Sequence, residues 1–137
     1  MDVLIVENDV SVLSYIVGLI QRWGHNAEKS ETGRDTIKKV KEKIFDLVLL
    51  DTSIHDMTAQ VLIAKLKELR PDIKIVTMTE SNTGELEKDI RTLGIVYYMS
   101  KPVSEGVLKD ILDHISMKKD RMVGQDEATV SDQRSSP

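Results

Sequence analysis

The stretch Phe45-Asp46-Leu47-Val48-Leu49-Leu50-Asp51 decides the fold of this chain of 137 residues. A short and almost continuous apolar run is typical of a β-strand buried on both faces, as in a parallel sheet covered by helices. This run stops at the carboxylate of Asp51. Ligands and chemistry collect at the carboxyl ends of the strands in an open parallel sheet. Asp51 is therefore the first candidate for a functional residue.

Three other apolar runs also end at polar residues. Residues 3–6 end at Glu7-Asn8-Asp9, residues 73–78 end at Thr79, and residues 95–100 end at Lys101-Pro102. If all four runs are parallel strands of one sheet, their polar ends share one rim. The sequence therefore predicts that an acid cluster, a lone acid, a hydroxyl and an ammonium group converge there.

Helical segments alternate with the strands, which predicts five βα units in a parallel α/β domain. We expect helices at residues 10–23, from Thr32-Gly33 to Ile44, at about 58–69 and at about 83–93. A fifth helix should begin at Pro102 and fade near Lys118. A weak polar strand at about 26–30 is expected at a sheet edge. The apolar spacing places Ile44, Val61 and, by strand parity, Tyr97 in the core.

The composition favours one soluble domain and limits its function. A formal net charge of −4 disfavours direct nucleic-acid binding, and the absence of cysteine excludes thiolate chemistry and disulfides. We expect no signal peptide or membrane segment, since strand residues begin directly after Met1 and apolar runs are short. These features fit a cytoplasmic protein. Residues 1–118 are the expected domain, and residues 119–137 a polar tail or linker.

The residues at the rim suggest phosphoryl chemistry. Oxygens of Glu7, Asn8 and Asp51 are suitable ligands for Mg²⁺ or Mn²⁺. Asp51 is then a candidate nucleophile toward phosphorus, Lys101 a point charge for a phosphoryl oxygen, and Thr79 a hydroxyl donor. Each residue alone also has a purely structural interpretation: Asp51 as a turn cap, Lys101 as a solvated charge, and Thr79 as a partner of nearby backbone.

Four motifs in order resemble the receiver domain of bacterial two-component response regulators. They are VLIVEND at 3–9, DLVLLD at 46–51 followed by Met57, VTMTE at 76–80 and YYMSKP at 97–102. The resemblance runs from Asp2 to about Lys119. It implies a flavodoxin-like (βα)5 fold, a doubly wound five-stranded parallel sheet with strand order 2-1-3-4-5.

The resemblance also implies a role for each rim residue. Asp51 is the phosphoacceptor, and the metal ligands are Glu7 and Asn8 at the acid-pair positions, Asp51 itself and the backbone carbonyl of Ser53. Thr79 is the switch hydroxyl, Lys101 is the lysine of the site, and Tyr98 is the rotating aromatic residue. A domain of this kind is a regulatory phosphoacceptor and not an enzyme; it promotes only its own phosphorylation and dephosphorylation.

The implied partner is a sensor histidine kinase or a phosphotransfer protein. The output surface implied by the resemblance combines the helix at 83–93, the strand at 95–100 and the final helix. The resemblance does not decide whether this surface forms a homodimer, binds another protein partner, or controls an output domain beyond the tail. The sequence does not choose between these.

Departures from the family pattern support a rival interpretation. Asn8 replaces an acid, His55 stands at the usual proline, Ala59 at the usual glycine, and Glu80 at a usually small residue. They suggest a pseudo-receiver that binds partners without phosphorylation, and Asp9 is a candidate N-cap or substitute ligand. A small phosphohydrolase is a third hypothesis. It is disfavoured because Ser53 stands where aspartate-nucleophile phosphatases carry a second acid.

Overall fold

The computed structural model describes residues 1–80 and 83–135, and only the backbone of residues 121–135. The chain forms two compact units, Met1–Val103 and one that begins at Ser104. The elements of the first unit are β1 (Asp2–Val6), α1 (Val10–Arg22), β2 (Asn26–Ser30), α2 (Gly33–Glu42), β3 (Leu47–Asp51), α3 (Ala59–Leu69), β4 (Ile75–Thr79), α4 (Gly84–Arg91) and β5 (Tyr97–Ser100). The second unit holds α5 (Glu105–Ser135).

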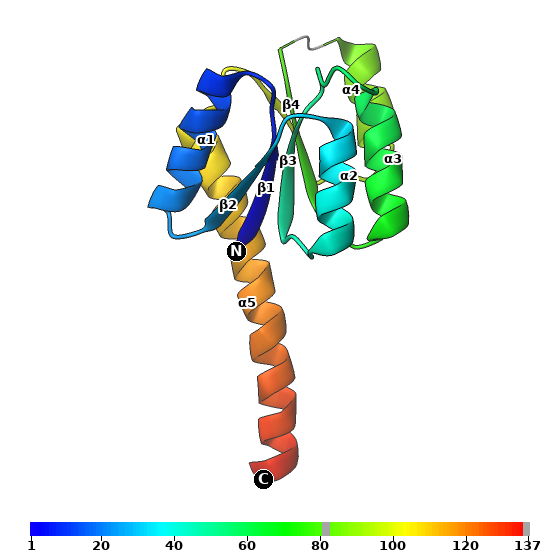
Figure 1. Ribbon diagram of the computed structural model, residues 1–137. Coiled ribbons are helices and arrows are strands. Elements are labelled where there is room, and N and C mark those ends of the chain that lie inside the picture. The colour runs from blue at the N-terminus through cyan, green and yellow to red at the C-terminus, as the bar shows by residue number, and fades with distance from the viewer. Residues whose placement is uncertain (81–82, 136–137) are drawn as a thin grey trace. The chain divides into compact units, whose positions relative to one another are not determined.

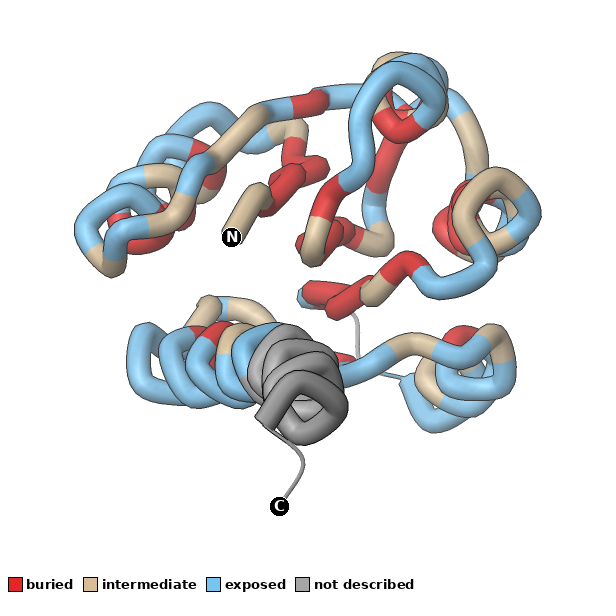
Figure 2. Tube along the Cα trace, turned by 90° about the horizontal axis from the view of Figure 1, so that it is seen from below, coloured by how far each residue is buried: buried red, intermediate tan, exposed pale blue. Residues whose placement is uncertain are grey.

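The five strands form one parallel sheet in the order β2-β1-β3-β4-β5. The predicted strand order and the edge position of β2 are therefore confirmed. Within the first unit, α1 lies on one face of the sheet, and α2, α3 and α4 lie on the other (Figure 1). Helices on both faces explain why β3 and β4 are buried along their whole lengths, as the red strands in Figure 2 show.

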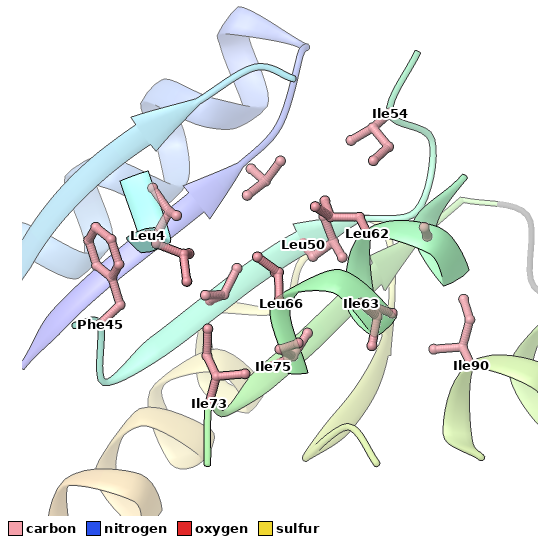
Figure 3. Packing of buried hydrophobic residues seen from close by; sticks show 14 of the residues in the cluster. Leu4, Phe45, Leu50, Ile54, Leu62, Ile63, Leu66, Ile73, Ile75 and Ile90 are labelled. Atoms are coloured by element: carbon pink, nitrogen blue, oxygen red, sulfur yellow. The ribbon is translucent and has the colours of Figure 1, made fainter. Parts of the chain in front are cut away.

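Alternate residues of the strands form two cores. Leu4 and Val48 belong to the cluster on the side of α2, α3 and α4, and Figure 3 shows Leu50 of β3 beside Leu62 of α3. The intervening strand residues face α1, whose buried side chains are Leu13, Ile16, Leu19 and Ile20. Each fully buried side chain of this size contributes roughly 1.5–3 kcal/mol to folding.

Polar caps fix where the helices of the first unit begin. Asp9 accepts hydrogen bonds from the backbone N–H groups of Ser11 and Val12, at 2.9 and 3.2 Å. It is therefore the N-cap of α1, as the sequence suggested. The hydroxyls of Thr32, Thr58 and Thr83 cap α2, α3 and α4 in the same manner.

Three residues of the first unit that were predicted in the core are exposed instead. Ile44 is 72% exposed because α2 ends at Glu42, so helical periodicity no longer applies to it. Val61 is 58% exposed because Ile63 takes the inward position on α3. Tyr97 is 42% exposed and Tyr98 is 6% exposed, so the side chains on β5 alternate in the opposite sense to the prediction.

Both predicted ends of the last helix are wrong. Pro102 does not open α5: the Lys101–Pro102 peptide bond is cis, and the helix begins at Glu105 with the carbonyl of Ser104 accepting from Leu108 N. The helix also does not fade near Lys118 but continues to Ser135. The segment 105–135 contains no proline, so nothing in it forces the helix to stop. The division into a domain at 1–118 and a tail at 119–137 stays a prediction.

Among the α5 residues whose side chains the structure describes, Leu108, Leu112 and Ile115 are the buried apolar ones, and they follow helical spacing. In the part of the chain that the structure describes, no helix combines the length and the apolar character needed to cross a membrane.

Candidate phosphoryl-transfer site

A cavity of about 400 Å³ opens at the carboxyl ends of the central strands. It is lined by Glu7, Asn8, Asp9, Asp51, Ser53, His55, Glu80 and Lys101. The sequence predicted that Glu7, Asn8, Asp51, Ser53 and Lys101 belong to one site, and the structure brings all five together. Asp9, His55 and Glu80 complete the lining.

The parallel register brings the two buried acids to the same level. Val6 of β1 pairs with Leu50 of β3, so Glu7 and Asp51 each follow directly on paired residues. Glu7 is 0% exposed and Asp51 is 2% exposed. One oxygen of Asp51, Oδ1, accepts a hydrogen bond from Ser53 N at 3.1 Å, and this bond orients the carboxylate.

Lys101 joins the two acids. Its Nζ lies 2.5 Å from Oε2 of Glu7 and 3.3 Å from Oδ2 of Asp51, and its side chain is 7% exposed. The backbone N–H of Lys101 donates to the carbonyl of Thr79 at 2.8 Å, which continues the β4–β5 pairing past Ser100. The ammonium group is therefore held within the cavity, beside the carboxylate expected to react.

Burial and charge shift the pKa values of this pair. Burial raises the pKa of Glu7 above its ordinary value of 4.5, and the hydrogen bond from Lys101 only partly opposes this effect. Burial alone would lower the pKa of Lys101, but the hydrogen bond to Glu7 and the charge of Asp51 outweigh it and raise that pKa. Lys101 therefore stays a cation.

Asn8 contacts a residue that the sequence interpretation left outside the site. Its side-chain nitrogen Nδ2 lies within hydrogen-bond distance of Nε2 of His55. His55 comes from the loop between β3 and α3, 47 residues further along the chain. The sequence signal that could have placed His55 in the site is its closeness to Asp51, which precedes it by four positions.

The loop that carries His55 is attached to the start of α2. The carboxylate of Asp56 accepts from the N–H groups of Gly33 and Arg34, at 2.8 and 3.0 Å. These bonds are the main reason why the pKa of Asp56 is lowered. Met57 packs against Gly33 so closely that a Cβ at residue 33 would lie 2.6 Å from its sulfur. The β3–α3 loop is thus fixed on the side facing α2.

Neither Thr79 nor Tyr98 lines the cavity, although Thr79 directly precedes Glu80 of the lining. Thr79 is the last residue of β4 and is buried. Tyr98 pairs in register with Thr77. The guanidinium carbon of Arg91 lies over the Tyr98 ring, 5.8 Å from the ring centroid. Within the described residues, the buried hydroxyls of Tyr98 and Thr77 have no hydrogen-bond partner.

Glu80 stands between two openings. It lines the cavity around Asp51 and also a neighbouring groove of about 550 Å³, whose other residues are Ser11, Val12, Tyr15, Lys101, Pro102 and Val103. Its side chain is exposed. An anion that approaches Asp51 from this groove passes a negative charge.

Comparison with known proteins identifies this arrangement. Residues 3–113 match the family model described as "Response regulator receiver domain". The chain belongs to this family. A receiver domain of two-component signalling is a regulatory phosphoacceptor rather than an enzyme that acts on external substrates, as the sequence predicted.

Relatives and solved structures agree with this assignment. The transcriptional regulatory protein ZraR of Salmonella typhimurium is 32% identical over 112 residues, which are 82% of this chain and 25% of ZraR. The receiver domain therefore spans about a quarter of the length of this curated relative. A receiver domain protein of Methanospirillum hungatei is 25% identical with a TM-score of 0.80, covering 88% of this chain and 97% of its own. A response regulator of Clostridium difficile shares the fold with a TM-score of 0.83 at 20% identity, covering 87% and 98% of the two chains.

Receiver domains typically use Mg²⁺, and the residues here fit that ion. Carboxylate, amide and carbonyl oxygens are the hard ligands that Mg²⁺ prefers, and the cavity lining offers Glu7, Asp51, Asn8 and Ser53. Among the described residues, no three acidic or histidine side chains are grouped so as to hold a metal ion by themselves. The oxygen of Asn8 and the backbone carbonyl of Ser53 are available to a cation in addition to the carboxylates of Glu7 and Asp51.

Proposed function

We propose that this receiver domain accepts a phosphoryl group on Asp51 from the phosphohistidine of a sensor histidine kinase or a phosphotransfer protein. The observation that carries the proposal is the buried Asp51 carboxylate, which faces an open cavity with Nζ of Lys101 3.3 Å away. A carboxylate needs charge screening and in-line access to attack phosphorus, more than it needs a general base.

The phosphoryl transfer requires no reactant other than the phosphorylated donor. A carboxylate oxygen of Asp51 forms the new bond to phosphorus while the bond from phosphorus to the donor imidazole nitrogen breaks. The electron pair of that bond stays on the leaving ring nitrogen, and the imidazole leaves as a neutral molecule because its other ring nitrogen carries a proton. Lys101 binds a phosphoryl oxygen and offsets its negative charge. Glu7, Asn8, Asp51 and the carbonyl of Ser53 would hold Mg²⁺, which would supply further neutralisation of the phosphoryl oxygens.

Thr79 and Tyr98 are the proposed switch. Thr79 ends the strand next to β3, which lets its hydroxyl donate to a phosphoryl oxygen on Asp51 after a small movement. Tyr98 lies on the same face of the neighbouring strand, two residues back in register. Phosphorylation would shift an existing equilibrium of these side chains and alter the surface of α4 and β5. The participation of α5 and a homodimer through that surface stay predictions.

The output and the compartment are also part of the proposal. ZraR is named as a transcriptional regulatory protein and is about four times as long as the matched segment. We therefore propose that the receiver controls an output domain or a partner protein, and does not bind nucleic acid itself. A cytoplasmic location remains the expectation from the cysteine-free sequence.

Intact mass after incubation with acetyl phosphate tests this function. We expect a gain of about 80 Da, one phosphoryl group, that requires both Mg²⁺ and Asp51. Asp51→Asn should abolish the gain. Asp72→Asn is the matched control, because this exposed carboxylate precedes β4 and lies outside the cavity lining.

The second candidate is a pseudo-receiver that binds partners without phosphorylation. The pairing of Glu7 with Lys101 and the neutral Asn8 favour it, since both reduce the negative charge available to a cation. No mass gain with acetyl phosphate and none with a cognate kinase would favour this alternative over phosphorylation. Phosphorylation that requires Asp51 would exclude it.

A further inference from the structure

The amide of Asn8 is an asymmetric ligand. Its Oδ1 can bind a cation, whereas its Nδ2 carries two hydrogens and repels one. An aspartate at this position would present an oxygen in either orientation. The cation site of this chain therefore requires that one particular end of the Asn8 side chain faces the cavity.

His55 occupies the position that can select this end. Nε2 of His55 faces Nδ2 of Asn8, and both residues line the cavity that contains Asp51. With its proton on Nδ1, the imidazole accepts a hydrogen bond at Nε2, and the amide N–H of Asn8 donates it. While this bond holds, Oδ1 of Asn8 points away from His55.

The chain restricts the movement of His55 on both sides. The preceding residue, Ile54, is buried in the core with 8% exposure. The following residue, Asp56, is bonded to two N–H groups at the start of α2, and Met57 packs on Gly33. An exposed side chain whose neighbours are both anchored returns to one place at little entropic cost.

We infer that His55 is a positioning residue that orients the Asn8 amide so that Oδ1 is available to a divalent cation. This inference rests on the proposed function, because it assumes that the cavity binds the cation used in phosphorylation. His55 acts through Asn8 and is not itself a ligand. A polar residue at 55 thus compensates for the missing acid at residue 8.

The inference predicts a coupling between two substitutions. Loss of an outer partner of a metal ligand typically reduces metal affinity 10–100-fold. Since this pair is partly exposed, we expect His55→Ala to weaken cation binding about tenfold. In an Asn8→Asp background the same substitution should change the affinity by less than about twofold, because a carboxylate needs no orientation.

The experiment measures Mn²⁺ affinity by electron paramagnetic resonance and Mg²⁺ affinity by competition, on the full chain. The variants are His55→Ala, Asn8→Asp and the double variant. His55→Gln is the rescue variant, because its Oε1 can accept from Asn8 Nδ2 and should retain most of the affinity. His114→Ala is the control for loss of an exposed imidazole. Circular dichroism checks that every variant is folded.

The inference is supported if His55→Ala lowers cation affinity about tenfold when residue 8 is Asn but not when residue 8 is Asp. An equal loss in both backgrounds would overturn it, because His55 would then act as a ligand or through the fold. No loss in either background would overturn it as well. If neither native protein nor Asn8→Asp binds a divalent cation, the metal site of the proposed function fails together with the inference. An equal loss in both backgrounds, or no loss in either, overturns the inference but leaves the proposed function intact.

Discussion

Nζ of Lys101 lies 2.5 Å from Oε2 of Glu7, although the two residues are 94 positions apart in the sequence. They meet because β1 and β5 end at the same rim of the sheet, with β3 and β4 between them. The contact neutralises a carboxylate that is completely buried. It also holds the ammonium group beside Asp51, whose Oδ2 is 3.3 Å from Nζ.

The ionisation of Glu7 should make the stability of the metal-free protein depend on pH. Its pKa is raised mainly by burial, so Glu7 contributes stability that is complete below the unfolded value of 4.5 and is lost as pH rises through the folded pKa. Relative to Glu7→Gln, the native unfolding free energy should fall by up to about 1.4 kcal/mol per pH unit across that window.

Urea denaturation in EDTA at several pH values from 4.5 upward measures this difference. Glu68→Gln is the control, since Glu68 is an exposed member of a surface pair with Lys65 at 3.9 Å. This control should change stability by less than about 0.5 kcal/mol at every pH. Parallel pH profiles for native protein and Glu7→Gln would contradict the assignment of a raised pKa.

Removal of Glu80 should accelerate phosphorylation by small anionic donors. One exposed charge near the path of an anion costs on the order of 1 kcal/mol at low salt, so Glu80→Ala should raise the rate with acetyl phosphate about fivefold. Salt screens exposed charges, and the difference should shrink at high ionic strength. Glu85→Ala, an exposed glutamate on α4 outside both openings, is the control. Equal rates for Glu80→Ala and native protein at low salt would refute this role.

Tyr98→Phe should stabilise the protein. The hydroxyl of Tyr98 is buried without a hydrogen-bond partner among the described residues, so its removal relieves a desolvation cost of about 1 kcal/mol. Tyr97→Phe is the matched control on the same strand, because Tyr97 is 42% exposed and should respond by less than about 0.5 kcal/mol. Thermal or urea denaturation compares the two, and destabilisation by Tyr98→Phe would mean that the hydroxyl is bonded in solution.

Gly33→Ala should destabilise the junction between α2 and the β3–α3 loop. A new Cβ would lie 2.6–2.7 Å from the end of the Met57 side chain, and we expect a cost of about 1 kcal/mol for displacing it. Gly18→Ala on α1 meets nothing within 4 Å and should stabilise by about 0.5–1 kcal/mol. Urea denaturation measures both effects. Met57→Ala should suppress the cost of Gly33→Ala, and additive effects would exclude the predicted clash.

The sequence predicted the sheet because its strands are short, apolar and bounded by turn residues. The four apolar runs and the weak polar run at 26–30 form the five strands close to where they were expected, and Glu7, Asp51 and Lys101 lie at strand ends on the same rim. Helical periodicity gave wrong predictions beyond the true ends of the helices, at Ile44 after the end of α2 and at Pro102 before the start of α5. Tyr97 and Tyr98 could not be distinguished by type, because only the register of β5 against β4 decides which one points inward.

The site was predictable to the extent that strand ends define it. Glu7 and Lys101 directly follow β1 and β5, and Asp51 is the last residue of β3, so the fold alone brings them together. His55 belongs to a loop, and its contact with Asn8 depends on how Asp56 and Met57 attach that loop to α2. Such tertiary contacts between elements have no periodic signal in the sequence.

The uniform burial of β3 and β4 has a consequence for how this domain tolerates change. Leu47 to Leu50 are apolar at every position, but Asp46 and Asp51 flank them, so a strand shifted by one residue would carry a carboxylate into the buried layer. Such a shift would also move Asp51 out of level with Glu7 and Lys101. A one-residue insertion or deletion in this strand should therefore reduce folding stability and disrupt the cavity at the same time.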